Sequence, residues 1–543
     1  MNTGSLRFVV YVVLGIVVGA IVAFLEWITI GVALHGLIES PTWMQILLPI
    51  VGFIAVPLLL RQWNDVTPAL ADAYIRSYHT GQGAEPVKLP KKLFASFITL
   101  ASGGAVGLEG SAVITGATLG QWTGDRRPDV LGQRNRLVLV VAGAAAGVAS
   151  LFKAPATGVL FALESPYRRD ISRQGLIPSL LAAASAYLTF VLILGDDRLL
   201  SFEPSQVTLQ DEILAAVLLG FLGAGAARLL VWAYRWAKAT GRELPMAVRL
   251  PVAAIGTTAS LLIVKALVDV PATLGPGAEI VTELVRDNEV ALGAIVALFF
   301  LRLVVTTSSL SMSGVGGVFI PLVIQGLLLG RAVELIVGAD ASGLYPVIGL
   351  AAVLGAAYRT PLAAVMFVAE TTGRAEFVIP ALIATAISQA LMGDRSVSVG
   401  QRGERQGQLE RRLDEPASFV MIELEPLKPE TTLLEVIDKY GDRPISPAIA
   451  VCGDEYVGLL VLHDVAMNIL EHGPEACAGD SMREFPAVKE TSPALEAALL
   501  MNEHDTAAVA VVNEKNIPVG IVSAMSLAGL NSSAIEAATH KGD

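Results

Sequence analysis

The fold of this chain is decided by residues 103–120, which read GGAVGLEGSAVITGATLG. The stretch is rich in glycine and small apolar residues, and it contains a single carboxylate, Glu109. An isolated carboxylate within a lipid bilayer costs about 3 kcal/mol, so it is a functional candidate by default. Glycines ahead of an apolar run let a helix restart, and the new N-terminus offers unpaired N–H groups that favour an anion. The stretch therefore predicts an anion site with an acidic gate, and a capping or interfacial role for Glu109 is the alternative.

The composition is that of an integral membrane protein. Of the 543 residues, 53% are hydrophobic and only 16% are charged, whereas soluble globular chains carry roughly 25% charged residues. A spanning helix needs about 20 apolar residues, and several uncharged runs are shorter or are broken by glycine or proline. This pattern predicts a compact bundle in which partial helices line a cavity. The uncharged runs are residues 8–25, 137–152, 213–227, 303–330, 341–358 and 377–393.

Charge is distributed unevenly along the chain. Residues 403–543 contain 24 Asp and Glu against 10 Lys and Arg, a net charge of −14, while the preceding residues sum to +2. This acidic tail offers no basic patch for a nucleic acid and would be repelled by an anionic membrane surface. The two cysteines, Cys452 and Cys477, lie in the tail without metal-ligand spacing, which favours reduced thiols in the cytosol.

The apolar part contains an internal repeat. AGAAAGVASLFKAPATGVLFALE at 142–164 aligns without gaps to IGLAAVLGAAYRTPLAAVMFVAE at 348–370, at an offset of 206. GLEGSAVITGATLG at 107–120 aligns to GVFIPLVIQGLLLG at 317–330, at an offset of 210. Glycine-broken segments at corresponding positions of two halves are typical of transporters, whose substrate site lies near the midplane between half-helix N-termini. The sequence leaves open whether the repeats are inverted or parallel.

The tail is repetitive as well. AIAVCGDEYVGLLV at 448–461 and AVVNEKNIPVGIVS at 510–523 each read as strand, turn and strand, and each follows a capped helix start. A tandem pair of α/β modules is expected, and the polar segment 61–90 of the membrane part is expected to be irregular. The resulting division is a membrane part, a charged linker and two modules: 1–393 (repeats at about 6–195 and 212–393), 394–416, 417–475 and 476–543.

Two short motifs carry a resemblance to a known family. GLEGS at 107–111 is similar to the Gly-Lys/Arg-Glu-Gly-Pro motif of the CLC family of chloride channels and proton-coupled chloride antiporters, and GVFIP at 317–321 fits its Gly-x-Phe-x-Pro motif. FKAP at 152–155 and the run to Glu164 also resemble the segment that leads out of the family's first repeat. The membrane part thus resembles a CLC protein, the tail resembles a tandem pair of CBS modules, and the likeness covers nearly the whole chain.

This resemblance implies an all-α polytopic membrane protein of tilted and partial helices in two inverted repeats, followed by an α/β CBS pair. It also implies a homodimer with one pore per subunit. Glu109 matches the family's gate, which occupies an anion site when charged and swings away when protonated. The backbone N–H groups of the second motif hold the anion, a role that passes to Val318 and Phe319. The residues assigned to the anion site are Gly107, Gly110, Gly317, Val318, Phe319 and Ile320.

The chain departs from the family's motifs at several positions. Leu108 and Ser111 replace a basic residue and a proline in the gate motif. TPALAD at 67–72 stands in place of the family's early Gly-Ser-Gly-Ile-Pro motif, and no tyrosine lies near 396–398 at the end of the last membrane helix. Ser165 occupies the position of the inner glutamate that carries protons in the antiporters. The absence of this inner glutamate favours a passive chloride channel by a small margin, with a proton-coupled anion antiporter as the alternative.

Four charged residues occupy equivalent positions of the two repeats. Glu164 and Glu370 lie at corresponding helix ends, so a structural cap or an ion pair is the expected role of each. Lys153 and Arg359 also correspond, and we interpret them as pairing or snorkelling residues, not as anion ligands.

In the tail, the resemblance suggests an adenine nucleotide. CBS pairs often bind such nucleotides through an acidic residue that holds the ribose hydroxyls. Asp464, six residues after Gly458, matches this acid, while Ser526 stands at the equivalent position of the second module. A purely structural role in dimerisation is the alternative.

Anion transport, not catalysis, is therefore the expected function. Chloride or a similar small anion passes between helix termini under the control of Glu109, in a plasma (inner) membrane with the tail in the cytoplasm. No enzymatic reaction and no metal are expected, and protons and membrane lipid are the other expected partners. A divalent-cation transporter would need several carboxylates around one cavity. Glu109 is the only acid within a glycine-broken segment, which argues against that class. A nucleotide sensor that no longer conducts is a further alternative.

Overall fold

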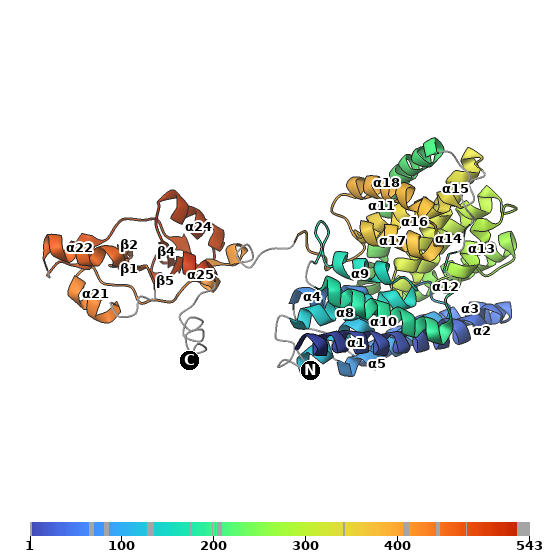
Figure 1. Cartoon of the computed structure of the whole chain (residues 1–543), viewed down its shortest axis with the longest axis horizontal. Helices are drawn as coiled ribbons and strands as arrows, with labels where there is room; N and C mark the ends of the chain where they lie inside the picture. Colours follow the sequence, from blue (N-terminus) through green and yellow to red (C-terminus); the bar gives the residue numbers. More distant parts are fainter. Residues whose placement is uncertain are drawn as a thin grey trace. The chain divides into compact units, whose positions relative to one another are not determined.

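The chain folds into two compact units, residues Met1–Arg405 and Gln406–Asp543 (Figure 1). The computed structural model describes residues 3–63, 70–80, 86–126, 135–172, 175–197, 199–200, 202, 209–339, 343–404, 412–440, 446–473 and 475–528. Part of the expected linker, residues 405–411, and the end of the second expected module, residues 529–543, lie outside the described residues.

The first unit is helical and suited to a membrane. Among the described residues, eight helices are long and apolar enough to cross a bilayer: Ser5–Ile38, Thr42–Trp63, Leu176–Leu194, Gln210–Glu243, Met246–Val268, Leu292–Ser311, Phe319–Val337 and Ala375–Met392. Four shorter apolar helices accompany them, at Arg136–Leu151, Pro155–Glu164, Leu344–Tyr358 and Pro361–Thr372. The expectation of a polytopic membrane protein with partial helices is confirmed.

The first repeat begins with a long helix that contains a π-helical stretch. Its elements are α1 (Thr3–Glu26), η1 (Trp27–Leu34), α2 (His35–Ile38), α3 (Thr42–Trp63), α4 (Leu70–Thr80), η2 (Pro86–Lys88), α5 (Leu89–Ala101), α6 (Glu109–Arg126), α8 (Asn135–Leu151), α9 (Pro155–Glu164) and α10 (Leu176–Leu194). The expectation that residues 61–90 are irregular is wrong, because α4 forms there. It buries Tyr74 and Ile75 in the core.

The second repeat contains α11 (Leu209–Glu243), α12 (Met246–Val268), α13 (Ala278–Arg286), α14 (Leu292–Ser311), α15 (Phe319–Val337), α16 (Leu344–Tyr358), α17 (Pro361–Thr372), η3 (Ala375–Phe377) and α18 (Val378–Met392). In the internal repeat, α6 corresponds to α15, α8 corresponds to α16 and α9 corresponds to α17. In Figure 1, α1, α8 and α10 pack together, while α16 packs against α11 and α18.

The chain does not leave the first unit at the end of α18. Val397 N donates to the Ala357 carbonyl at 2.9 Å, and Gln401 Nε2 donates to the carbonyls of Ser165 and Tyr358 at 2.9 and 3.0 Å. The segment that follows α18 therefore packs on the membrane helices, and the first unit extends beyond the expected boundary at 393.

The repeated glycines serve close helix packing. A Cβ on Gly116 of α6 would overlap the backbone carbonyl of Gly143 on α8, and a Cβ on Gly330 of α15 would overlap the carbonyl of Tyr345 on α16. Small residues spaced four apart allow membrane helices to approach this closely. Glycines also interrupt helices, as in the segments that precede α6 and α15 and at the C-termini of α15 and α17, where Gly338 and Gly373 are the caps.

The two repeats cap one another. Glu164, at the end of α9, accepts hydrogen bonds from the N–H groups of Leu362 (3.1 Å) and Ala363 (2.8 Å) at the start of α17. Glu370 of α17 accepts from the N–H groups of Ala156 (2.9 Å) and Thr157 (2.7 Å) at the start of α9. The C-terminal part of each helix meets the N-terminus of the other, so α9 and α17 run antiparallel. Equivalent helices that run antiparallel belong to inverted repeats, which settles what the sequence left open.

The second unit is an α/β pair. Its elements are α20 (Ala417–Val420), α21 (Leu433–Tyr440), β1 (Ala448–Cys452), β2 (Tyr456–Val461), α22 (Leu462–His472), α23 (Ala478–Ser481), β3 (Val488–Lys489), α24 (Ala494–Glu503), β4 (Ala508–Val512), β5 (Pro518–Ser523) and α25 (Ala524–Ala528). Strands β1 and β2 pair antiparallel, as do β4 and β5, and β3 joins β4 in parallel.

The two modules exchange their leading segments. Ile422, which follows α20, makes two backbone hydrogen bonds with Ile521 of β5, at 2.8 and 2.9 Å. Arg483, which follows α23, makes two with Leu459 of β2, both at 2.9 Å. The expected modules 417–475 and 476–543 are therefore interleaved: the start of each packs on the sheet of the other.

The close approach of α6 and α8 can be tested with one substitution. Gly116→Leu places a side chain where the carbonyl of Gly143 lies, and overpacking of this kind costs about 1–3 kcal/mol or prevents folding. We expect a lower melting temperature and a smaller folded fraction, measured by size-exclusion chromatography of heated detergent extracts. Gly225→Leu is the matched control, because a Cβ on Gly225 meets no heavy atom within 4 Å. Equal thermal stability of the two variants would contradict this account of the packing.

Candidate anion site at the repeat interface

The two glycine-broken segments meet and pair. Gly107 N donates to Gly317 O, and Gly317 N donates to Gly107 O, both at 2.8 Å. This antiparallel bridge joins the residues that precede α6 to those that precede α15. The N-termini of these two helices are thereby brought together at the interface between the repeats, where the sequence placed the substrate site.

The carboxylate of Glu109, the predicted gate, occupies this junction. Glu109, the first residue of α6, is 2% exposed. Its Oε1 accepts a hydrogen bond of 2.5 Å from the N–H of Phe319, the first residue of α15, and the N–H of Ile320 also faces the carboxylate. The second oxygen, Oε2, has no hydrogen-bond partner among the residues that the structure describes. The carboxylate therefore lies at the positive end of a helix dipole, where an anion is stabilised.

The assigned anion-site residues play different parts. Phe319 and Ile320 present N–H groups to the carboxylate, and their binding of an anion stays a prediction. The N–H groups of Gly107 and Gly317 are committed to their mutual bridge. These two glycines contribute space instead, because a Cβ on either would overlap the carboxylate of Glu109.

The other two assigned residues flank the junction. Val318 is the N-cap of α15, and its N–H faces the Tyr358 hydroxyl. Gly110 is buried in the first turn of α6, next to Glu109. Neither contacts the carboxylate in the hydrogen bonds described above.

An aromatic cluster surrounds the start of α15. The ring of Phe319 lies 4.6 Å from Phe152, 5.1 Å from Phe367, 5.6 Å from Phe161 and 5.9 Å from Tyr358, measured between centroids. Phe152 corresponds to Tyr358 in the internal repeat, and Phe161 corresponds to Phe367. The cluster keeps bulk water away from the junction and so strengthens electrostatic interactions within it.

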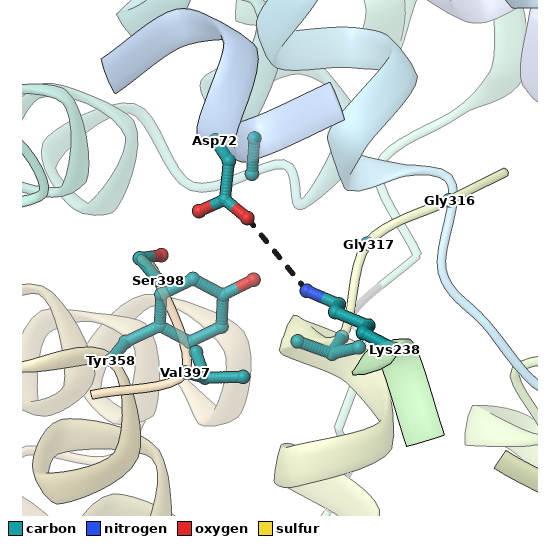
Figure 2. Close-up of a pocket in the computed structure, with 9 residues that line it drawn as sticks. Asp72, Lys238, Gly316, Gly317, Tyr358, Val397 and Ser398 are labelled. Atoms are coloured by element: carbon teal, nitrogen blue, oxygen red, sulfur yellow. Dashed lines mark ion pairs between the residues drawn. The ribbon is translucent and has the colours of Figure 1, made fainter. Parts of the chain in front are cut away.

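A small pocket adjoins this junction. It is lined by Ala71, Asp72, Lys238, Gly316, Gly317, Val318, Tyr358, Val397 and Ser398. Figure 2 shows the Tyr358 hydroxyl directed toward the space between Asp72 and Lys238, whose charged atoms lie 3.8 Å apart. Sequence reasoning assigned no role to Asp72 and did not consider Lys238 or Tyr358. They come from α4, α11 and α16, and no local motif links them.

Charged residues expected to have structural roles do have them. Glu164 and Glu370 are helix caps, as the hydrogen bonds between α9 and α17 show. Lys153 Nζ donates to the Asp197 carbonyl at 2.8 Å, and Arg359 Nη1 donates to the Gly393 carbonyl at 2.6 Å. Both cations donate hydrogen bonds to backbone carbonyls, and neither is hydrogen-bonded to Glu109.

Ser165 lies at the end of α9 and is 2% exposed. Its hydroxyl has no hydrogen-bond partner among the described residues. A serine hydroxyl does not ionise at physiological pH, so this position supplies no titratable carboxylate. Within the described residues, no group of three or more His, Cys, Asp or Glu is arranged to hold a metal ion.

In the second unit, Asp464 lies in the first turn of α22. Its Oδ2 is 2.5 Å from Nη2 of Arg483. The carboxylate is thus paired with a cation of the same unit, and nucleotide binding at Asp464 stays a prediction.

Sequence comparison connects this geometry to known proteins. The family model for voltage-gated chloride channels matches residues 51–393, and the model for the CBS domain matches residues 478–530. The H(+)/Cl(−) exchange transporter ClcA of Cronobacter sakazakii is 29% identical over 352 residues, which are 60% of this chain and 73% of the relative. ClcA of Vibrio cholerae is 28% identical over 318 residues, which are 55% of this chain and 66% of the relative.

Solved structures share the fold. A CLC-type fluoride/proton antiporter superposes with a TM-score of 0.63 at 23% identity, covering 74% of this chain and 98% of its own. A eukaryotic CLC transporter superposes with a TM-score of 0.60 at 18% identity and covers 96% of this chain and 98% of its own. With the family model matched over most of the chain, this protein belongs to the voltage-gated chloride channel (CLC) family and carries a CBS-type C-terminal unit.

Proposed function

We propose that this protein exchanges chloride, or a similar small anion, for protons across the membrane. The observation that carries the proposal is the position of the Glu109 carboxylate on the N–H of Phe319. A titratable group lies where the helix terminus would hold an anion, so the binding of a proton and the binding of an anion are linked at one place. The names of the Cronobacter and Vibrio relatives, both H(+)/Cl(−) exchange transporters, support this choice.

The charge on Glu109 decides whether an anion can bind. While the carboxylate is ionised, it accepts the charge-assisted hydrogen bond at the start of α15 and excludes a second anion from that position. When Oε2 takes up a proton, the group becomes neutral and its attraction to the helix terminus falls. The N–H groups of Phe319 and Ile320 then become available to an anion that enters from either side.

The small preference for a passive channel finds no support among these relatives. It rested on Ser165, which replaces the family's inner glutamate. Exchange remains chemically feasible if another group on the same side binds the proton. The anion itself is left as chloride or a close analogue, because the serine- and tyrosine-bearing motifs of the family are missing from this chain.

We also propose that the protein is a homodimer of the plasma membrane whose second unit lies in the cytoplasm. Support for this orientation comes from a basic loop, since positively charged loops favour the cytoplasmic side. The N–H groups of Arg168 and Arg169 donate to the carbonyls of Arg402 and Gly403, at 2.9 and 3.0 Å. Arg169 also binds Asp394 at 2.6 Å and holds the pKa of that carboxyl below its usual range. The basic loop and the start of the connection to the second unit therefore share one membrane face.

The gate assignment predicts the behaviour of Glu109→Gln. Glutamine resembles the protonated gate in shape and charge, so anion flux should continue while coupled proton movement and the pH dependence of flux disappear. The measurement is simultaneous recording of anion efflux and proton uptake in liposomes that contain purified protein. Wild-type protein that moves anions without protons would refute the exchanger, and unchanged pH dependence in the variant would refute the gate.

The space beside the gate generates a second prediction. Gly317→Ala places a methyl group against the carboxylate of Glu109, so the gate must move while the backbone is retained. We expect faster anion efflux at high pH, where the wild-type gate is charged and in place. In a Glu109→Ala background the same substitution should have no further effect, because the group it displaces is gone. Additive effects of the two substitutions would contradict the contact.

The orientation can be tested with the two native cysteines. Cys452 and Cys477 both lie in the second unit and form no disulfide. In intact cells a membrane-impermeant maleimide should leave them unlabelled, and labelling should appear after the membrane is permeabilised. Labelling of intact cells would place the second unit outside.

A further inference from the structure

We propose that Asp72 is the proton-binding group on the face of the first unit from which the chain continues, and that it supplies protons to Glu109 past Tyr358. This inference rests on the proposed exchange of anions and protons. That exchange needs a titratable group between the gate and one face of the membrane, and Ser165 cannot serve. Asp72 comes from α4, in the polar segment that sequence analysis expected to be irregular.

The position of the pocket is the first support. Asp72 lines it together with Gly316, Gly317 and Val318, the residues that lead into α15. Gly317 also lies against the carboxylate of Glu109. One short piece of backbone thus borders both the pocket and the gate. Ser398, beyond the end of α18, lines the pocket as well, which places it on the face where the connection to the second unit begins.

The Asp72 carboxylate is accessible and only partly hydrogen-bonded to the described residues. Its side chain is 13% exposed, so it is sheltered but within reach of water. Oδ1 accepts a long hydrogen bond of 3.3 Å from Val399 N, and Oδ2 lies 3.8 Å from Lys238 Nζ. Neither contact saturates the carboxylate, which can accept about four hydrogen bonds. An oxygen remains able to take up a proton from solvent.

Tyr358 connects this carboxylate to the gate. Its hydroxyl points toward the space between Asp72 and Lys238 (Figure 2). The phenol also faces the N–H of Val318, the residue before Phe319, whose N–H holds the Glu109 carboxylate. Ring packing against Phe319 and Phe161 fixes its orientation. A hydroxyl can accept a proton on one side and release its own on the other, because it is both acceptor and donor.

The proton balance of the route is simple. A proton leaves water on this face and binds an Asp72 oxygen. It moves through water in the pocket, or by way of the Tyr358 hydroxyl, to Oε2 of Glu109, the gate oxygen without a partner among the described residues. Asp72 returns to its carboxylate form and Tyr358 is unchanged.

Two charged or titratable groups line the pocket beside Asp72, and both bear on this step. Lys238 of α11 places its ammonium group 3.8 Å from the carboxylate, and Tyr358 of α16 presents its hydroxyl. Glu109 of α6 is the destination. An anion that entered beside Lys238 would offset the positive charge and favour protonation of Asp72. Anion entry and proton uptake from this face would then assist one another, which coupled exchange requires.

The test is proton and anion movement in liposomes that contain full-length Asp72→Asn. Asparagine keeps the acceptor for Val399 N and removes the titratable group. We expect proton movement per anion to fall about tenfold or more, while anion efflux stays within a factor of about two. Asp269→Asn is the matched control, because Asp269 is exposed, lies outside the pocket and has a left-handed backbone that asparagine tolerates. Asp72→Glu keeps a carboxylate and should keep coupled movement.

The outcomes of this experiment distinguish the role of Asp72 from the proposed exchange of anions and protons. Wild-type protein that moves no protons would overturn both. Wild-type coupling that persists unchanged in Asp72→Asn would overturn the role of Asp72 alone.

A second variant covers the case in which Asp72→Asn fails to fold. Lys238→Met removes the positive charge nearest the carboxylate, which favours its protonated form, so coupled proton movement should extend to higher pH. An unchanged pH profile in Lys238→Met would overturn the inference.

Discussion

The structure depends on one contact between the two halves of the membrane unit, the seating of the Glu109 carboxylate on the first N–H of α15. A charge buried in a bilayer is tolerated only where fixed dipoles replace water. The helix terminus supplies that replacement, and the backbone bridge between Gly107 and Gly317 holds the two helix starts together. The same N–H groups and helix dipole that stabilise the carboxylate would stabilise a bound anion, which is the basis of the proposed exchange.

Close helix packing and the exclusion of water characterise the surroundings of the site. Helices α6 and α8, and their counterparts α15 and α16, approach closely because glycines remove the side chains between them. Close packing of this kind makes the short helices rigid, so their termini stay where the dipoles are needed. The aromatic rings around Phe319 exclude water from the same volume. Rigid packing and dryness both raise the strength of an interaction between a helix terminus and an ion.

Part of this site could be predicted from the sequence, and the reason for each success or failure is physical. Glu109 and Phe319 lie in motifs whose chemistry is local: a glycine break, a helix start and one acid. Glu164 and Glu370 were recognised as caps from their symmetry, yet the helix that each one caps belongs to the other repeat. Asp72 received no role, and Lys238 and Tyr358 were not considered, because only the tertiary fold brings the three together. Likewise, the commitment of Gly107 N–H to Gly317 is a pairing between distant segments, which periodicity cannot indicate.

The crossed caps of α9 and α17 bear on how the membrane unit assembles. Each half of the chain can insert its long helices alone. The N–H groups at the N-terminus of its short helix, α9 or α17, lack a partner until the other half provides a carboxylate. In lipid, such unsatisfied groups cost several kcal/mol each. The first half must therefore wait, incompletely folded, for the second to be synthesised. The two halves of this membrane unit must therefore complete α9 and α17 together, and neither half can complete its own short helix alone.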